Sequence, residues 1–510
     1  MLKLVNFFSK FPLKILILFS AFFIVALLVR VPFLLSTNLD EGIYLTVSDY
    51  VSRGFVLYKD IPENKPPLIF LINSFLIPVL GHNILSFRML LTFLTAIVAV
   101  LLFYITDKIS SPPAGLISGL IFSSFSSLPI YEIFWVRTES YLIFLEIVAL
   151  YIFVLEPRTL CKYNYLILGL LIGCILLVRQ TGLLFAFAIL CTLLIRFSKR
   201  DLAVKEFLLF LSGVFVCIFI TLAYFFFNNA FQDMLYWVIF EPFSFLRMTY
   251  ESTNIFPLLK VLWFLDIVVV SLPLILLSTY GLKKFNLKGR ARIYVIVLLV
   301  WLVALSGITL LSNLVPGYHH EYAEILIPLS LCSAIGIRAL CVDLKKLKFY
   351  GLFIASLLLV SFFAFLYPLT LSRIDSYEYR TDDLTIVNNV SDFLKKNTSK
   401  NESVYVFETL WPKNSLNIYF TSERFPQLTR LFYFPNFITR NETVLLVDSL
   451  ERAKTPYIVM IGPAPAFPEA NNIYQYITTH YSPSLSLGSY SPFPWLKDQP
   501  IVIFKRMTPS

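Results

Sequence analysis

Apolar runs of about 20 residues recur through the first 370 positions of this 510-residue chain. A helix of that length is what crosses the hydrocarbon core of a bilayer. The composition agrees, because 57% of the residues are hydrophobic and 15% are charged, whereas a soluble globular domain has about 25% charged residues. These values exclude a cytosolic enzyme, a disordered chain and a fibrous protein. The sequence predicts a polytopic α-helical membrane protein.

Eleven membrane spans are predicted. The first is too long for the apolar region of a signal peptide and has no small-residue cleavage site, so we interpret it as a membrane helix. The segment Pro66–Leu80 is apolar but only about 15 residues long, which favours an interfacial or re-entrant helix over a span. The predicted spans lie at 13–35, 86–107, 113–134, 139–155, 164–178, 182–197, 206–228, 258–282, 291–312, 322–341 and 349–369.

The distribution of Lys and Arg predicts the orientation of these spans. If Pro66–Leu80 does not cross the membrane, 19 of the 28 basic residues before position 370 lie on the cytoplasmic side and nine lie outside. If it crosses, eight lie inside and 20 outside. The first model therefore satisfies the positive-inside rule, and it also accounts for the net charge of +10 without nucleic acid. It places the N-terminus in the cytoplasm and residues 370–510 outside, in what we expect to be a prokaryotic plasma membrane.

Polar and charged residues become more frequent after residue 369. Strand-like runs alternate there with helical patterns, which is typical of a small layered sheet. The six cysteines all precede residue 342 and follow neither a disulfide framework nor a CxxC pattern. We therefore predict a transmembrane domain at 1–369 and an extracytoplasmic α/β domain at 370–510. Its predicted strands are Ser403–Phe407, Tyr457–Ile461 and Ile501–Lys505, with helices at 382–396 and near 443–453 and 471–480.

In the eleven-span model, charged and aromatic residues gather on the outer face. The first outer loop, 36–85, begins with Asp40 and Glu41 and includes Lys65 directly before two prolines. Between them lies an amphipathic stretch, with Ile43, Val47, Tyr50 and Val51 on one face, which is typical of a helix lying in the membrane interface. The other residues of this outer set are Arg88, Arg137, Glu139, Arg179, Glu241, His319, His320, Glu321 and Tyr322.

Each of these residues also has a purely structural explanation. Asp40 and Glu41 can cap the interfacial helix, since acidic residues favour helix N-termini. Lys65 can extend its amine to the lipid headgroups, and Arg137 and Arg179 can mark helix ends. The adjacent pair His319-His320 cannot easily share one metal ion on a helix, so we favour hydrogen bonding over metal binding.

Four further titratable residues stand apart from the outer set. Glu146 and Asp266 lie within predicted spans, where a charge serves either a function or a structural partner inside the bundle. His82 and His480 are isolated, and we interpret both as structural.

As a set, these residues indicate a specific chemistry. A carboxylate on the outer loop can act as a general base, and several cations at one membrane depth can hold a phosphate at the level of the headgroups. This arrangement suits the transfer of a group from a lipid-linked phosphate to an acceptor at the outer face.

The segment from Asn38 to Leu90 resembles the first outer loop of GT-C glycosyltransferases, in particular the protein O-mannosyltransferase and lipid A aminoarabinose transferase group. That loop begins with Asp-Glu, continues to a Lys-Pro-Pro about 25 residues later, and ends at an Arg that opens the next span. Here these are Asp40-Glu41, Lys65-Pro66-Pro67 and Arg88. The resemblance extends weakly to about residue 370, through Arg137-Thr138-Glu139, Arg179-Gln180-Thr181-Gly182 and the run from Tyr322 to Pro328.

The resemblance implies roles for individual residues. Asp40, next to Glu41, would activate the acceptor, and Glu139 would be a second acidic residue where Asp is more usual. Lys65, with Arg137 and Arg179, would bind the donor phosphate, although a Lys is usual at the position of Arg179. No cofactor is required, and a divalent metal stays open, because Asn64 replaces the acid that often precedes the lysine. Further contacts to acceptor or donor are implied for Arg88, His319, His320 and Tyr322.

We therefore predict a membrane glycosyltransferase, of hexosyl or pentosyl type, that uses a polyprenyl-phosphate sugar and inverts the sugar. The acceptor would be a protein, a lipid or a polysaccharide. Two other classes stay open. A transporter or flippase of lipid-linked sugars would show internal repeats and polar groups near the midplane, and no repeat is found. A non-catalytic membrane scaffold would not need the Asp-Glu and Lys-Pro-Pro loop.

Overall fold

A computed structural model describes most of the chain, and it divides into two compact units, which are described separately. Unit 1 contains residues up to Val31, Asn64–Ile69 and the described residues from Met89 to 346. Unit 2 contains Pro32–Glu63, Phe70–Arg88 and the described residues after 382. The described residues are 13–155, 163–200, 202–242, 256–284, 301, 319–346, 383–409, 414–426, 439–463, 465, 468–490 and 499–507.

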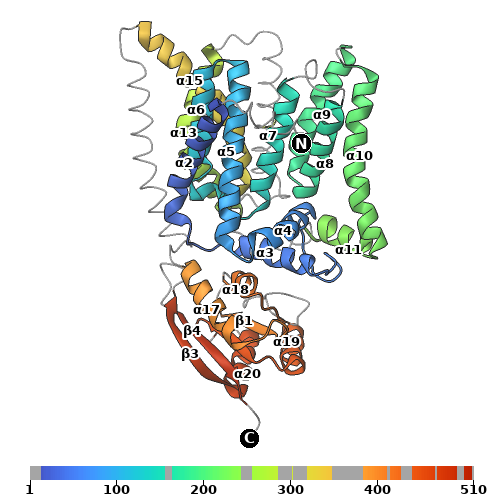
Figure 1. Cartoon of the computed structure of the whole chain (residues 1–510), viewed down its shortest axis with the longest axis vertical. Coiled ribbons are helices and arrows are strands. Elements are labelled where there is room, and N and C mark those ends of the chain that lie inside the picture. Colours follow the sequence, from blue (N-terminus) through green and yellow to red (C-terminus); the bar gives the residue numbers. More distant parts are fainter. Residues whose placement is uncertain are drawn as a thin grey trace. The chain divides into compact units, whose positions relative to one another are not determined.

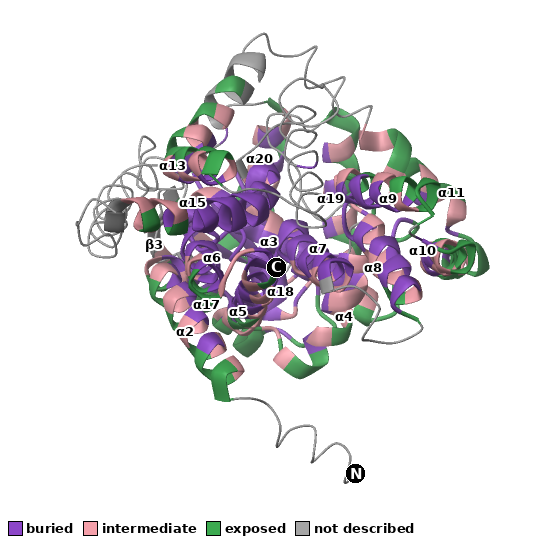
Figure 2. Cartoon of the chain, turned by 90° about the horizontal axis from the view of Figure 1, so that it is seen from above, coloured by how far each residue is buried: buried purple, intermediate pink, exposed green. Residues whose placement is uncertain are grey.

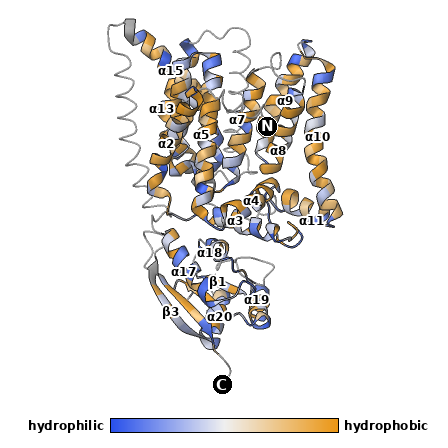
Figure 3. Cartoon of the chain, in the orientation of Figure 1, coloured by the Kyte–Doolittle hydropathy of each residue, from blue (hydrophilic) through white to orange (hydrophobic). Residues whose placement is uncertain are grey.

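Unit 1 is helical, and its helices carry mostly apolar side chains (Figure 3). Five stretches are long and apolar enough to cross a membrane: Leu13–Phe33, Ile84–Ile109, Val204–Phe227, Phe264–Lys284 and His320–Asp343. These helices support an integral membrane protein. The eleven-span count stays a prediction, and the spans predicted at 291–312, except for Trp301, and at 349–369 lie outside the described residues.

The helices of this part follow most of the predicted spans closely, but α15 begins four residues after the predicted start at 322 and ends five residues after 341, and one further span differs in kind. The span predicted at 113–134 ends as a helix at Phe125, and a short 3-10 helix, η2 (Pro129–Tyr131), follows. Pro129 has no amide hydrogen and cannot continue the helix. The main helices are α2 (Leu13–Arg30), α5 (Ile84–Ile109), α6 (Pro112–Phe125), α7 (Thr138–Leu155), α8 (Asn164–Val178), α9 (Gly182–Ser198), α10 (Val204–Phe227), α11 (Phe231–Leu235), α13 (Phe256–Lys284) and α15 (Leu326–Lys346).

Polar and small residues fix how these helices pack. Arg30, at the end of α2, is fully buried and donates hydrogen bonds to the hydroxyls of Ser127, Thr92 and Thr95 at 3.0, 3.0 and 2.7 Å. Between α8 and α10, a Cβ at Gly169 or Gly213 would overlap the backbone of the facing helix. Small residues therefore allow close approach of these two helices, as is common between membrane helices. The outer face of α10 is largely exposed (Figure 2), as expected of a helix that faces lipid.

Unit 2 contains a four-stranded sheet in the order β1-β2-β4-β3 (Figure 1). β1 and β2 are parallel, with Val406 opposite Val459, whereas β4 is antiparallel to both β2 and β3. The strands predicted from sequence are present as β1 (Val404–Glu408), β2 (Tyr457–Ile461) and β4 (Gln499–Arg506), and β3 spans Tyr481–Tyr490. The helices of the C-terminal segment are α17 (Asp383–Asn397), α18 (Ser415–Ser422), α19 (Arg440–Ala453) and α20 (Pro468–His480).

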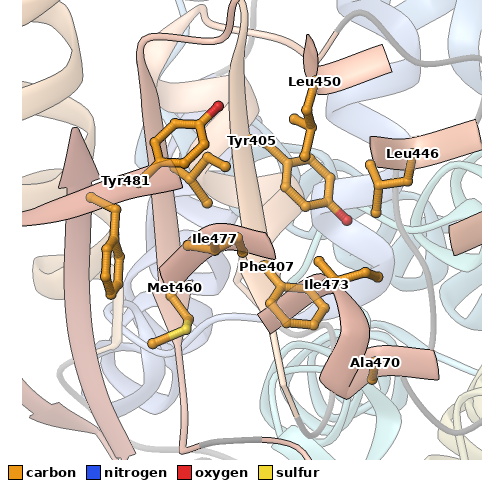
Figure 4. Close-up of a cluster of buried hydrophobic side chains, with 11 residues drawn as sticks. Tyr405, Phe407, Leu446, Leu450, Met460, Ala470, Ile473, Ile477 and Tyr481 are labelled. Carbon is orange, nitrogen blue, oxygen red and sulfur yellow. The ribbon is translucent and has the colours of Figure 1, made fainter. Parts of the chain in front are cut away.

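The hydrophobic core of unit 2 lies on one face of this sheet (Figure 4). Side chains of β1 and β2, including Phe407 and Met460, pack there against Leu446 of α19 and Ile473 of α20. On β1, the backbone amide of Val406 donates to the Tyr419 hydroxyl of α18 at 2.9 Å. Helix α18 thereby joins the sheet to the first outer loop, described next.

The unit 2 residues of the predicted first outer loop pack against the C-terminal segment. Helix α3 of the loop (Leu39–Ser52) contacts α18, and a Cβ at Gly42 would press on Leu416 and Asn417. Nine of the 14 residues of α3 are buried, so both of its faces are covered, unlike the one-sided interfacial helix expected from the sequence. The second helix of this region is α4 (Leu68–Leu80), 13 residues long. At 1.5 Å per residue α4 reaches about 20 Å, which is too short to cross a bilayer.

Several hydrogen bonds between described residues join the loop to that segment. The Thr37 hydroxyl donates to Asn414 Oδ1 at 2.7 Å, and Asn417 Nδ2 donates to the Asn38 carbonyl at 3.1 Å. The Thr46 hydroxyl donates to the Leu416 carbonyl at 2.8 Å, and the Leu384 amide donates to the Leu35 carbonyl at 2.8 Å. Alternation of apolar and polar residues cannot reveal such a contact, since its partners are about 370 residues apart in sequence.

Candidate functional site

Arg179 is the centre of a buried charged cluster in unit 1. It caps the C-terminal end of α8 and is 6% exposed. Its guanidinium forms an ion pair with Glu139 of α7, and Nη1 donates to the Thr138 hydroxyl at 3.1 Å. Its Nη2 lies 3.4 Å from Glu321 Oε1. Hydrogen bonds from charged groups in a buried setting are stronger than those between neutral groups, so they fix the guanidinium in one orientation.

A second arginine–carboxylate ion pair adjoins this cluster. Arg137 forms an ion pair with Glu132, and its Nη2 lies 3.3 Å from His320 Nε2. His320 Nδ1 is 3.5 Å from Glu132 Oε2, and its Nε2 is 3.5 Å from Glu139 Oε1. The imidazole therefore links the two arginine–carboxylate pairs. This contact agrees with the expectation that His320 forms hydrogen bonds; the side chain of His319 lies outside the described residues.

The position of Glu132 was not anticipated from the sequence. It has a φ of 54°, in the left-handed region that is uncommon for residues other than glycine. The predicted span at 113–134 placed it inside a membrane helix, but the end of α6 at Phe125 leaves it in the connection to α7. Strained residues cluster at functional sites, and here the strained backbone directs a carboxylate to Arg137 and His320.

The Lys65 segment reaches the same region of unit 1. The side-chain amide of Gln180, next to Arg179, donates to the Asn64 carbonyl at 3.1 Å. Pro66 and Pro67 are buried, whereas Lys65 is only partly buried, directly before α4. The residue before a proline is held in an extended conformation, so Lys65 is excluded from the helix that follows. Lys65 and Arg179 therefore lie on neighbouring segments.

The residues of the Asp-Glu motif have different environments in unit 2. The side chain of Asn38 caps α3 by accepting hydrogen bonds from the amides of Asp40 and Glu41. Glu41 is fully buried, and its carboxylate accepts a hydrogen bond from Arg88 Nε at 3.1 Å and another from Arg88 Nη2. Arg88 is 1% exposed and donates to the Leu34 carbonyl too. Glu41 and Arg88 are therefore paired with each other in the interior, whereas Asp40 is partly buried.

Two further residues of the predicted outer set differ in their exposure. Tyr322 has no exposed surface, and its ring lies 5.5 Å from that of Phe264. Glu241 is partly buried near η3 (Tyr236–Phe240). Asp40 belongs to unit 2, whereas Lys65 belongs to unit 1.

The described residues do not fit a metal centre. Among them, no group of three or more His, Cys, Asp or Glu side chains is arranged to hold an ion. The carboxylates of Glu132 and Glu139 instead pair with arginines. No chemical step is therefore derived through a metal.

Comparison with known proteins identifies the fold. Residues 64–225 match the family model for dolichyl-phosphate-mannose-protein mannosyltransferase, a region that contains Lys65, Arg137 and Arg179 but not Asp40. No curated protein matches the chain in sequence comparison.

Two kinds of solved structure share the fold. ArnT from Cupriavidus metallidurans in the apo state has a TM-score of 0.59 and 14% identity over 96% of this chain and 97% of that chain. The same enzyme bound to undecaprenyl phosphate has a TM-score of 0.57 and 11% identity, with the same coverage. The oligosaccharyltransferase AglB from Archaeoglobus fulgidus, with an inhibitory peptide and a dolichol-phosphate, has a TM-score of 0.52 and 12% identity over 89% of this chain and 70% of that chain.

The family match and the shared fold together confirm the resemblance to the GT-C superfamily, and within it to the group that includes ArnT and the protein O-mannosyltransferases.

Proposed function

We propose that the chain is an integral membrane glycosyltransferase that transfers one sugar from a polyprenyl-phosphate donor to an acceptor at the outer face. The observation that carries this proposal is the group of fixed cations in unit 1. Arg179 and Arg137 are held rigidly by carboxylates, and the Lys65 segment lies beside them. Fixed cations stabilise the negative charge that develops on a leaving phosphate without having to reorganise.

In this reaction, Asp40 accepts the proton of the acceptor hydroxyl or amine. The acceptor atom forms a bond to the anomeric carbon of the sugar, and the bond from that carbon to the phosphate oxygen breaks. The bonding electrons leave with the polyprenyl phosphate, whose charge Lys65, Arg137 and Arg179 stabilise. A single displacement of this kind inverts the anomeric centre. Glu41 and Arg88 hold the first turn of α3, which carries Asp40.

The donor and acceptor chemistry of the similar proteins supports this proposal. ArnT is described with undecaprenyl phosphate, and AglB with dolichol-phosphate and a peptide. For this chain we propose a polyprenyl-phosphate sugar, of mannosyl type or another hexose or pentose, and an acceptor that is a protein, a lipid or a polysaccharide. The extracytoplasmic position of the C-terminal domain is part of the same proposal.

Transfer from a panel of labelled polyprenyl-phosphate sugars by the purified full-length protein tests the proposal. Asp40→Asn should lower turnover by about 10²–10⁴-fold, the contribution of a positioned general base. Asp60→Asn, in the same loop, is the matched control and should retain turnover. Proteoliposomes that move the donor across the membrane with no transfer, and no effect of Asp40→Asn, would instead identify a flippase.

A further inference from the structure

Two carboxyl groups lie buried in unit 1, behind the arginine cluster. Glu146 of α7 has no exposed surface, and Glu324 of η4 (His319–Ile325) is 1% exposed. The two carboxyl groups are close enough to interact directly. Within the described part of the chain, neither oxygen of Glu146, nor Oε2 of Glu324, forms a hydrogen bond of standard geometry with another group. Helix α7 packs against η4, and the two carboxyl groups are neighbours at this contact.

The charges around this pair require a proton. Arg179 is the cation that acts on Glu324, and it also pairs with Glu139 and contacts Glu321. One positive charge thus faces several carboxylates. Two carboxylates that share a dry site cannot both be ionised, so such a pair retains one proton.

A donor near the pair indicates where the proton resides. The Thr181 hydroxyl donates to Glu324 Oε1 at 3.2 Å. Groups that donate hydrogen bonds favour the ionised form of a carboxyl group. If the pair shares one proton, this donor favours Glu324 as the anion and Glu146 as the protonated acid.

The same contacts connect the pair to the candidate site. η4 carries both Glu321, which contacts Arg179, and Glu324, which accepts from Thr181. Arg179, Gln180 and Thr181 form the turn between α8 and α9. Two residues spaced by three on η4 therefore hold the two ends of this turn.

We propose that Glu146 and Glu324 form a proton-sharing carboxyl pair that positions the 179–181 turn, and with it the guanidinium of Arg179, for the phosphate of a lipid-linked substrate. The positioning role rests on the function proposed above, whereas the shared proton does not. Glu146 and Glu324 are positioning residues, because they act through Thr181 and Arg179.

Infrared spectroscopy of the full-length protein tests the proton. At neutral pH, the carbonyl band of a protonated carboxyl group should be present in the wild type and lost in Glu146→Gln. Asp266→Asn, which changes another carboxyl group of the helical unit, is the control and should retain the band. A band that persists in Glu146→Gln, or that is absent from the wild type, overturns the shared proton.

Donor kinetics test the positioning. Thr181→Val removes the hydroxyl that joins Glu324 to the turn, and should raise the donor KM by about tenfold, the equivalent of one lost hydrogen bond to a charged group, while the infrared band remains. Thr181→Ser keeps a hydroxyl and should restore the KM. Glu146→Leu leaves no donor toward Glu324 and should raise the donor KM in the same direction as Thr181→Val.

A wild-type KM in Thr181→Val would refute the positioning role. If no donor in the panel is used by any variant, the proposed function fails, and the infrared result still decides the shared proton.

Discussion

The pair of Glu41 and Arg88 allows a quantitative test of how the first loop is held. Both side chains are at most 1% exposed, and Arg88 donates through Nε and Nη2 to the two carboxylate oxygens of Glu41. Removing one partner of a buried pair leaves an uncompensated charge, which typically costs about 3–5 kcal/mol. We therefore expect Glu41→Gln and Arg88→Met each to lower the free energy of unfolding by about 3–5 kcal/mol.

The double variant isolates the pairwise interaction. It leaves neither charge unpaired, so its loss should be clearly smaller than the sum of the two single losses. Denaturant unfolding of the purified chain, followed by fluorescence, gives these free energies. Glu451→Gln is the control, because Glu451 is 43% exposed in its pair with Arg506 and such surface pairs contribute about 0–1 kcal/mol. Single variants that lose less than about 1 kcal/mol, or additive losses, would refute the positioning role of this pair.

Three other perturbations have defined outcomes. Lys65→Met should raise the activation free energy of transfer by about 2–4 kcal/mol, as for a lost oxyanion donor. Near wild-type turnover would mean that the lysine only contacts headgroups. Burial alone would raise the pKa of Asp49, but hydrogen bonds from His82 and Arg53 outweigh it and lower that pKa. The stability that Asp49 contributes is therefore present above its unfolded pKa of about 4 and is lost as the pH falls through the lower folded value. His82→Ala should weaken this pH dependence of the free energy of unfolding, and an unchanged pH profile would exclude the contact. Gly169→Leu should abolish the close packing of α8 on α10 and reduce thermal stability, whereas Leu208→Ala on the exposed face of α10 should not.

The sequence predicted most helices because hydrophobic length is a local property. The bounds of α8 match the predicted span, α7 begins one residue earlier than predicted, α13 differs by two residues at each end, and α15 by four or five. The exception, at 113–134, arises where serines and Pro129 interrupt an apolar run, since the length of such a run does not reveal where a backbone amide donor is missing. The parallel strands β1 and β2 were also predictable, because each is buried along its whole length and is therefore a nearly continuous apolar run, whereas β3 was not predicted.

The candidate site was less predictable, for a physical reason. Sequence identified charged residues at helix ends, such as Arg179 and Glu139, but could not pair them, because their contact depends on the tertiary arrangement of α7 and α8. It treated His82 as an isolated residue, whereas the fold brings it within 3.0 Å of Asp49. Glu324 was hidden inside a predicted span, although a carboxyl group at such a place is itself a signal of function or of a buried partner.

The packing of unit 2 changes how the C-terminal segment should be understood. Helix α3 carries Asp40, and the surface that covers α3 comes from α18, more than 370 residues later in the chain. Gly42 is required at this contact because a side chain there would meet Leu416 and Asn417. The first turn of α3 is also held by α5, through the buried pair of Glu41 and Arg88. Asp40 is therefore fixed by contacts from both ends of the sequence, so the C-terminal segment belongs to the scaffold of the proposed base in addition to any role in acceptor binding.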